Sequence, residues 1–295
     1  MDAKLKKCSW IIHPMALAHA VSSFLLGRLG LSDEILLSLL TISTIVLVCY
    51  VYGLPLEVSA ALAALCCFAA FYLGTLGGRW LNASGLPFLN TYSSEITTFL
   101  VTEVMGWATV IIAKNRGQVT QAKTDISSIM TALKQVKTDY NRILLTDGGI
   151  NGSHKASISN DIATISGDTY SALIAELSVP KNSGLDSTVS KRINKRRKVY
   201  LDPKNGFDPT AAYTSTANAE KLWLDPWGEK YVVYVKTKNT DELAIPDTSK
   251  TIASEIAIYS FGPNGTDDKG CNVELESCIS SGNHKNHDDI ASWNL

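Results

Sequence analysis

Four long apolar stretches fill most of the first 113 residues and limit how this chain can fold. They read SWIIHPMALAHAVSSFLLG (residues 9–27), ILLSLLTISTIVLVCYVYG (35–53), VSAALAALCCFAAFYLGTL (58–76) and ITTFLVTEVMGWATVIIA (96–113). Each approaches the roughly 20 residues that a helix needs to cross the hydrocarbon core of a bilayer. The second and third contain no charged residue, so we predict that both span a membrane.

The first stretch is open to three interpretations. It contains His13 and Pro14, and it lies between Lys4, Lys6 and Lys7 on one side and Arg28 on the other. It can span, lie at the membrane interface, or act as a signal peptide with ALAHA as its cleavage region. If the lysines and Arg28 are all cytoplasmic, the chain after Ala113 lies outside the cytoplasm. If the first stretch spans with its lysines inside, that part is cytoplasmic.

Residues 114–295 are polar, and the charge and cysteine content of the chain bear on its expected partners and cellular compartment. The whole chain has a net charge of -1, which does not favour a nucleic-acid partner. Cys271 and Cys278 are close together in a polar segment, a spacing that suits a disulfide in an oxidising compartment. The other four cysteines lie in or beside the apolar part, where a thiol behaves as a small hydrophobe.

The fourth apolar stretch continues into an amphipathic helix. Its apolar positions recur in steps of three and four, which predicts one buried helical face. These positions are Val119, Ala122, Ile126, Ile129, Leu133, Val136, Tyr140 and Ile143. Glu103 is a carboxylate near the start of the apolar half, where an unpaired charge costs a few kcal/mol. It is either solvated at the headgroup boundary or paired.

Three segments of the polar part carry local signals. TYSALIAELS (169–178) predicts a short helix, and KRINKRRKVYLDP (191–203) predicts a loop leading to a strand. The basic residues of that loop lack interleaved aromatic side chains, so we interpret them as a solvated edge. In DPWGEKYVVYV (225–235), Asp225 can cap a turn, Gly228 can adopt a positive φ, and a strand follows, as at the start of a β-hairpin.

Residues 99–140 resemble the N-terminal helix of type IV pilins and of type II secretion pseudopilins. Phe99 stands where the mature family members begin, and Glu103 stands at their fifth residue. The resemblance implies that Glu103 pairs with the N-terminal amine of a neighbouring subunit. In the second half, the family's pattern is matched by Ala122, Asp125, Ile126, Ile129, Ala132 and Leu133. Thr98 departs from the family, because prepilin peptidase requires Gly or Ala there.

Three further motifs follow in the order found in the major, G-type pseudopilins. They are DPWGEKY (225–231), IAIYSFGPNG (256–265) and DDIASW (288–293). The resemblance therefore covers residues 99–295 and implies an α+β fold, in which a long helix packs on a small antiparallel sheet with a calcium-type C-terminal loop. It gives three regions: membrane helices in 1–95, the long helix in 96–145, and a pseudopilin-like domain in 146–295. The helix has a membrane half (96–113) and an amphipathic half (114–145).

The resemblance implies a structural subunit of a type II secretion or type IV pilus-like assembly, which polymerises through its N-terminal helix and binds calcium in its C-terminal loop. Hard oxygen ligands on a loop suit Ca²⁺, and the candidate ligands are Phe261 (through its carbonyl), Asn264, Asp267, Asp268, Asp288 and Asp289. The expected partners are other pseudopilin subunits, inner-membrane secretion or pilus assembly proteins, and membrane lipid. The expected location is a bacterial inner membrane, with the C-terminal domain in the periplasm or outside.

Two alternatives remain open from the residues. Cys271, Cys278, His284 and His287 can be read as a zinc site, although the cysteine spacing is wider than usual. The chain can also be a polytopic membrane protein that uses its outer domain for binding or sensing and never polymerises. No phosphate-binding loop, nucleophile elbow, metalloprotease helix or dinucleotide fingerprint occurs, so we do not expect an enzyme.

Overall fold

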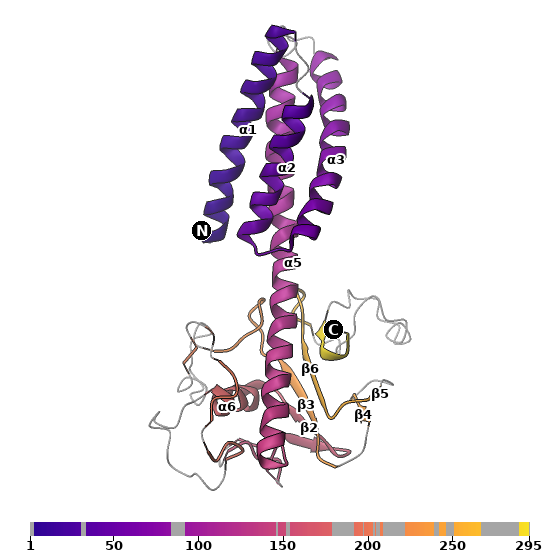
Figure 1. Ribbon diagram of the computed structural model, residues 1–295. Helices are drawn as coiled ribbons and strands as arrows, with labels where there is room; N and C mark the ends of the chain where they lie inside the picture. The colour runs from indigo at the N-terminus through magenta and orange to yellow at the C-terminus, as the bar shows by residue number, and fades with distance from the viewer. Residues whose placement is uncertain are drawn as a thin grey trace. The chain divides into compact units, whose positions relative to one another are not determined.

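The computed structural model shows two compact units, Met1–Gly117 and Gln118–Leu295 (Figure 1). The structure describes residues 3–30, 34–83, 92–145, 147–151, 154–178, 192–196, 198–202, 204, 207–208, 222–238, 242–245, 251–266 and 289–294.

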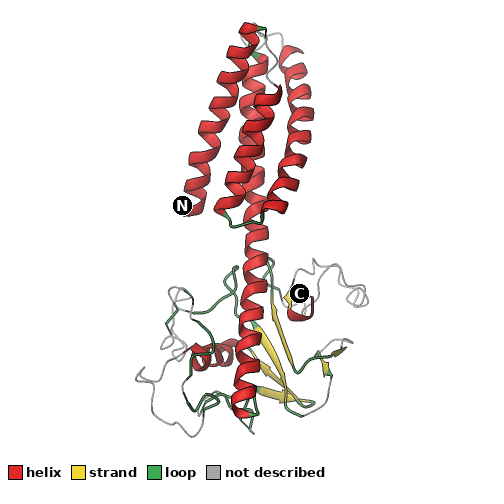
Figure 2. Ribbon diagram, in the orientation of Figure 1, coloured by secondary structure: helices red, strands yellow, loops and turns green. Residues whose placement is uncertain are grey.

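Unit 1 is a bundle of apolar helices. It contains α1 (Ala3–Leu29), α2 (Glu34–Val51), α3 (Leu56–Ala83) and the first half of α5 (Ser93–Tyr140), which lie side by side in Figure 2. Three of these helices are long and apolar enough to cross a membrane, in Ala3–Leu29, Leu56–Gly77 and Ser93–Tyr140, and a shorter apolar helix covers Ile35–Val51. Large apolar side chains such as Ile35 and Phe68 point outward, 80% and 78% exposed. Several long apolar helices thus indicate a membrane protein, as the sequence predicts.

The first apolar stretch forms a full-length helix within this bundle. One face of α1 is buried, at Cys8, Ile12, Ala16, His19 and Ser23, and this spacing of three and four residues is that of a single helical stripe. Ile12 and Cys8 share a core with Ile45 and Cys49 of α2 and Val110 of α5. The first stretch is therefore packed in unit 1 as an integral helix of the bundle.

The second half of α5 belongs to unit 2. The predicted face is confirmed, because Ala122, Ile126, Ile129, Leu133 and Val136 are all fully buried. The helix ends at Tyr140, five residues before the predicted end at residue 145. Asn141 follows with a φ of 53°. A residue in the left-handed region just after the last helical turn is a common way to end a helix.

The sheet of unit 2 has five antiparallel strands in the order β1-β2-β3-β6-β7. They are β1 (Ser157–Ser159), β2 (Ile162–Ile165), β3 (Val232–Lys236), β6 (Ile256–Ser260) and β7 (Ile290–Ala291). A separate pair joins β4 (Leu243–Ala244) and β5 (Thr251–Ile252), and a 3-10 turn, η5, covers Ser292–Asn294. The predicted small antiparallel sheet is therefore confirmed.

Both faces of the sheet are covered. Side chains alternate along β3: Val233 and Val235 join the core shared with α5 and α6 (Gly167–Ser178), whereas Val232 and Tyr234 join a second core. That second core contains Tyr259, and Phe261 and Trp293 pack against it. Burial of alternate residues in two cores fixes the register of the strand, because a one-residue slip would exchange the two faces.

Two local predictions need correction. The described residues of 191–203 contain no strand; instead the N–H groups of Tyr200 and Leu201 donate to the Leu177 carbonyl, at 2.9 and 3.1 Å. The DPWG turn forms as predicted, with Gly228 at a φ of 101°. The strand that follows does pair antiparallel with β6, the next strand of the same sheet along the chain, but β4 and β5 lie between them in sequence, so the two are not joined by a tight turn.

Asp125 is a buried carboxylate that joins α5 to the start of β3. It is 3% exposed, and its Oδ2 accepts hydrogen bonds from the Tyr231 hydroxyl (2.9 Å) and from Lys204 Nζ, while Oδ1 accepts one from Gln121 (2.9 Å). Burial, followed by the nearby Asp125 charge, raises the pKa of Tyr231 far above its ordinary value, so that the phenol remains a donor. Three donors offset the cost of removing this carboxylate from water.

We predict that Asp125→Asn destabilises unit 2 by about 3 kcal/mol, because it leaves the Lys204 ammonium without its buried partner. Hydrogen exchange of the β3 amides in the full chain measures this loss. Asp161→Asn is the matched control, since Asp161 forms an exposed ion pair with Lys238, and pairs of that kind contribute at most about 1 kcal/mol. Equal effects of the two substitutions would contradict this role for Asp125.

Candidate functional site

Glu103 has two partners within unit 1. His13 Nδ1 of α1 lies 2.7 Å from Glu103 Oε1, and Trp107 Nε1 donates to Glu103 Oε2 at 3.2 Å. The Glu103 side chain is only 16% exposed, whereas that of His13 is 55% exposed. Both imidazole and indole can donate to a carboxylate, so the group is satisfied without a bulk water shell. The interpretation of Glu103 as a merely solvated residue is therefore wrong.

Close packing of α1 against α5 supports this arrangement. Gly106 lies one turn after Glu103, and a Cβ atom placed there would lie 2.8 Å from Ile12 Cγ2. Ile12 is fully buried and directly precedes His13. A small residue in one helix lets a neighbouring helix approach closely in an apolar medium, where packing drives association. The same contact that seats Ile12 thus brings His13 to Glu103.

Phe99 and Thr98 lie inside a continuous helix. α5 begins at Ser93, five residues before Thr98, and the Thr98 carbonyl accepts a hydrogen bond from Thr102 Oγ1 at 2.8 Å. Phe99 is half-buried. The position at which the resemblance expects a new N-terminus is therefore within regular backbone.

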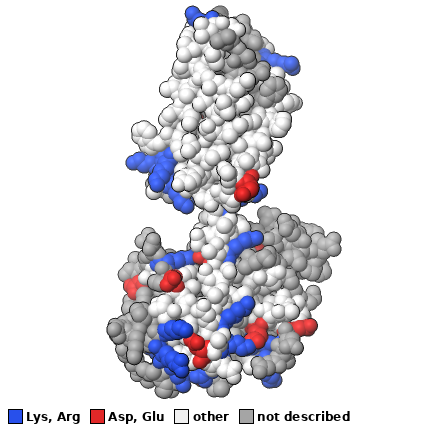
Figure 3. All heavy atoms as spheres, viewed as in Figure 1, with Lys and Arg blue, Asp and Glu red and all other residues white. Residues whose placement is uncertain are grey.

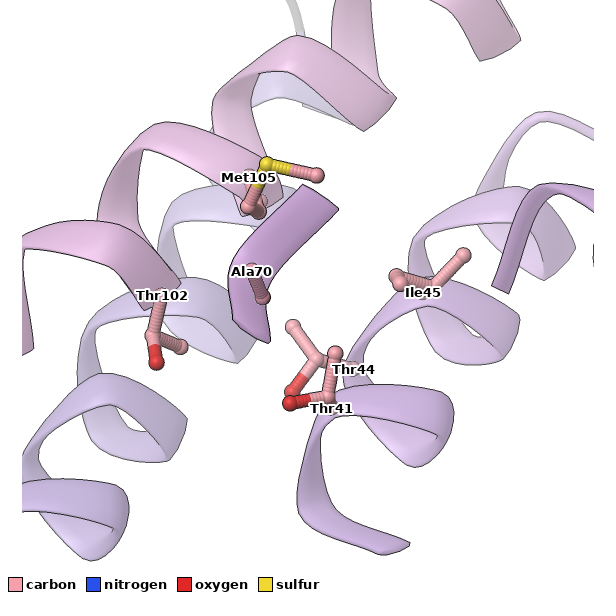
Figure 4. A pocket seen from close by; sticks show the side chains of 7 residues that line it. Thr41, Thr44, Ile45, Ala70, Thr102 and Met105 are labelled. Carbon is pink, nitrogen blue, oxygen red and sulfur yellow. The ribbon is translucent and has the colours of Figure 1, made fainter. Parts of the chain in front are cut away.

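A small cavity lies close to this group, among α2, α3 and α5. Its volume is about 10 Å³, and its lining consists of Thr41, Thr44, Ile45, Ala70, Thr102, Met105 and Gly106 (Figure 4). The three threonine hydroxyls donate to the carbonyls of Leu37, Leu40 and Thr98. A volume of this size holds at most one water, so the cavity is too small to bind a substrate.

The turn before β3 is held by Asp225. Its Oδ1 accepts from the backbone N–H groups of Trp227 (3.0 Å) and Glu229 (2.8 Å), and its Oδ2 accepts from Ser260 Oγ at 2.5 Å. Asp225 is 5% exposed. It therefore caps the turn as predicted and also ties the turn to the end of β6.

The C-terminal calcium candidates are only partly described. Phe261 directly follows β6 and Asp289 directly precedes β7, so each is the next residue beyond the last pair of the β6–β7 ladder, Ser260 with Ile290. Asn264 Oδ1 accepts from the Thr266 N–H at 2.6 Å in a tight turn. Among the described residues, no three His, Cys, Asp or Glu side chains gather as a metal site. The remaining predicted residues lie outside the described part: Asp267, Asp268, Cys271, Cys278, His284, His287 and Asp288.

The basic segment is more than a solvated edge. Arg192 pairs with the buried Glu176 at 3.2 Å, and the fully buried Asn194 donates to the carbonyls of Glu176 and Lys198. Tyr200 and Lys198 both donate to Asp139 and lower the pKa of its carboxyl. Of the described basic residues in this segment, Lys195, Arg196 and Lys198 are exposed.

Sequence reasoning missed two of these residues. In the sequence His13 is only a polar residue in an apolar stretch; the signal that could have paired it with Glu103 is that ionisable residues in different membrane helices normally meet, although His19 in the same stretch is an equal candidate by that criterion. Asn194 carried no such signal, because asparagine in a polar loop is ordinary. Searches for similar protein families, curated proteins and solved structures gave no match.

We predict a coupling of about 1–2 kcal/mol between His13 and Glu103, because hydrogen bonds between membrane helices are of this order and charge strengthens them. A double-mutant cycle with His13→Ala and Glu103→Ala measures it, through reversible unfolding of the full chain in mixed micelles. Leu17→Ala, on an exposed position of α1, serves as the control and should show no coupling to Glu103→Ala. A coupling of zero for His13 would overturn the assignment.

Proposed function

We propose that this chain is a pseudopilin-like structural subunit that keeps its first three helices and contributes unit 2 to a type II secretion or type IV pilus-like assembly from a fixed membrane anchor. Its partners would be other pseudopilin subunits and inner-membrane assembly proteins. The role is structural, without catalysis. The observation that carries the proposal is the bond between His13 and Glu103, because it satisfies in the same chain the carboxylate that the resemblance assigns to a neighbour's amine.

The position of the expected cleavage point supports retention of the anchor. The bond between Thr98 and Phe99 lies within α5, whose backbone is helical from Ser93 onward. Proteolysis favours exposed and flexible chain segments, and Thr98 replaces the residue that prepilin peptidase requires. Both features favour a chain that is not processed before Phe99.

Packing of α1 on α5 supports a fixed anchor over ordinary filament growth. In a filament of the kind that the resemblance implies, the first half of α5 would pack against equivalent helices, but here α1 occupies the face that contains Gly106. Another face of α5 is open, since Leu100, Val104 and Ile111 are 53%, 59% and 63% exposed. That open face favours a second candidate, in which α5 still packs on neighbouring subunits and the protein polymerises with its anchor attached.

We place the protein in a bacterial inner membrane, with unit 2 outside the cytoplasm. If all four apolar helices span, the lysines in the first turns of α1 and the chain after α5 are on the same side. The positive-inside rule alone would then favour a cytoplasmic unit 2, because Lys4, Lys6 and Lys7 would accompany it. The resemblance and the cysteine spacing favour the outside, and long domains are exported largely regardless of charge.

We expect the mature protein to retain residues before Phe99. Intact-mass measurement of protein purified from its native membrane should give a chain that still contains α1–α3, because the cleavage point is helical and lacks the required residue. Thr98→Gly provides the comparison, since it restores the family's residue without altering the His13 pair. A wild-type chain that starts at Phe99 would refute the fixed anchor and support the polymerising subunit.

We propose further that calcium orders the C-terminal loop. Phe261 and Asp289 are the next residues beyond the last pair of the β6–β7 ladder, and Asn264 lies three residues after Phe261. A backbone carbonyl, a carboxylate and an amide oxygen are the kinds of ligand that Ca²⁺ uses. The Asn264 oxygen is neutral and already accepts a bond from Thr266, so the other carboxylates would have to come from Asp267, Asp268 and Asp288.

Limited proteolysis of right-side-out membrane vesicles tests on which side of the membrane unit 2 lies and whether the C-terminal loop binds Ca²⁺. We predict that external protease reaches unit 2, and that Ca²⁺, but not Mg²⁺, slows cleavage of the C-terminal segment. Asn264→Asp should lower the Ca²⁺ concentration required, because it adds a charge at a ligand position, and Asp289→Asn should raise it. Protection of unit 2 until the vesicles are lysed, or cleavage rates independent of Ca²⁺, would count against these proposals.

A further inference from the structure

A groove lies on unit 1 between the beginning of α1 and the end of α2. Its volume is about 590 Å³, and it is lined by Ala3, Lys6, Lys7, Trp10, Ile11 and Val51. The groove is broadly open rather than enclosed. Lys4 Nζ lies 5.5 Å from the centre of the Tyr52 ring, a contact that joins the two helices beside the groove.

The rim of the groove is positively charged. Lys6 and Lys7 are exposed, and neither forms an ion pair with a carboxylate in the described part of the chain. The first turn of α1 contains no acidic residue, although the positive end of the helix dipole lies there. Basic side chains gather at this end of the bundle (Figure 3). Lysines near a helix N-terminus are unfavourable because the positive end of the helix dipole also lies there. An anion bound at this place would be attracted both to the lysine ammonium groups and to the helix N-terminus.

The wall of the groove is apolar and suits a lipid better than a soluble anion. Ile11 and Val51 are half-buried, and Trp10 is 75% exposed. Trp10 follows Lys7 by three residues, which is about 4.5 Å along the helix axis. A tryptophan just below a pair of lysines is the arrangement found where a membrane helix meets the headgroup layer. A free phosphate would use only the rim and leave the apolar wall uncovered.

We propose that this groove binds an anionic phospholipid. The lipid phosphate lies between Lys6 and Lys7, its glycerol region packs on Trp10, and an acyl chain runs along Ile11 and Val51. The ligand class follows from the combination of two cations, an interfacial tryptophan and an apolar wall, which basic pockets for lipid headgroups share. The site depends only on unit 1 and is independent of the proposed role in assembly.

Fluorescence quenching in nanodiscs tests the site with the full chain. The Trp10 signal is obtained as the difference between the wild type and Trp10→Phe. Brominated phosphatidylglycerol should quench this signal at a lower mole fraction than brominated phosphatidylcholine does. We expect a preference of roughly fivefold per lysine, because each basic side chain near an anionic lipid contributes about 1 kcal/mol. Added salt should weaken the preference.

The double variant K6Q/K7Q should lose the preference for the anionic lipid while its Trp10 remains accessible to phosphatidylcholine. K123Q/K134Q, which removes two exposed lysines of unit 2, is the matched control and should keep the preference. Equal quenching of the wild type by the two lipids would show that the groove contacts lipids without selecting the anionic one, and would overturn the proposal. A preference that survives in K6Q/K7Q would likewise overturn the proposal.

Discussion

A carboxylate inside an apolar helix determines which helices of unit 1 must stay together. Glu103 cannot be left unpaired in lipid without a cost of a few kcal/mol, and His13 and Trp107 provide its hydrogen bonds. Trp107 comes from the same helix, one turn away, and alone it leaves the second oxygen without a donor. The partner that another helix must provide is His13, so α1 is part of the environment that makes Glu103 tolerable.

The rest of the bundle is consistent with that requirement. Gly106 allows Ile12 to come close enough to seat α1, and Gly77 plays a similar part where a Cβ atom would lie 2.9 Å from Thr97 Cγ2 of α5. Thr41, Thr44 and Thr102 donate to carbonyls four residues earlier in their own helices. The buried His19 of α1 adds a second polar contact between helices, because its Nε2 lies 3.1 Å from both Thr41 Oγ1 and the Leu37 carbonyl of α2. Glu103 differs because its side chain has only acceptors and must find donors elsewhere.

Periodicity predicted the elements better than it predicted their partners. The steps of three and four from Val119 to Val136 correctly identified the buried face of α5, and the alternation in YVVYV correctly identified β3. The Asp225 cap and the positive φ at Gly228 followed from turn chemistry that is local in sequence. The neighbours of β3 were not predictable in this way, because β2 and β6 are distant in sequence and strand pairing depends on the whole core. The pairing of His13 with Glu103 spans 90 residues and was missed for the same reason.

The most direct test of this account is a disulfide between α1 and α5 in native membranes. In a background without the natural cysteines, Ile12→Cys combined with Gly106→Cys places two thiols at a close contact between the helices. Ile12→Cys with Val104→Cys places the second thiol on the exposed face. The account predicts that mild oxidation crosslinks the first pair within a single full-length chain and leaves the second pair uncrosslinked. Crosslinks only between chains, or a mature chain that lacks residue 12, would contradict it.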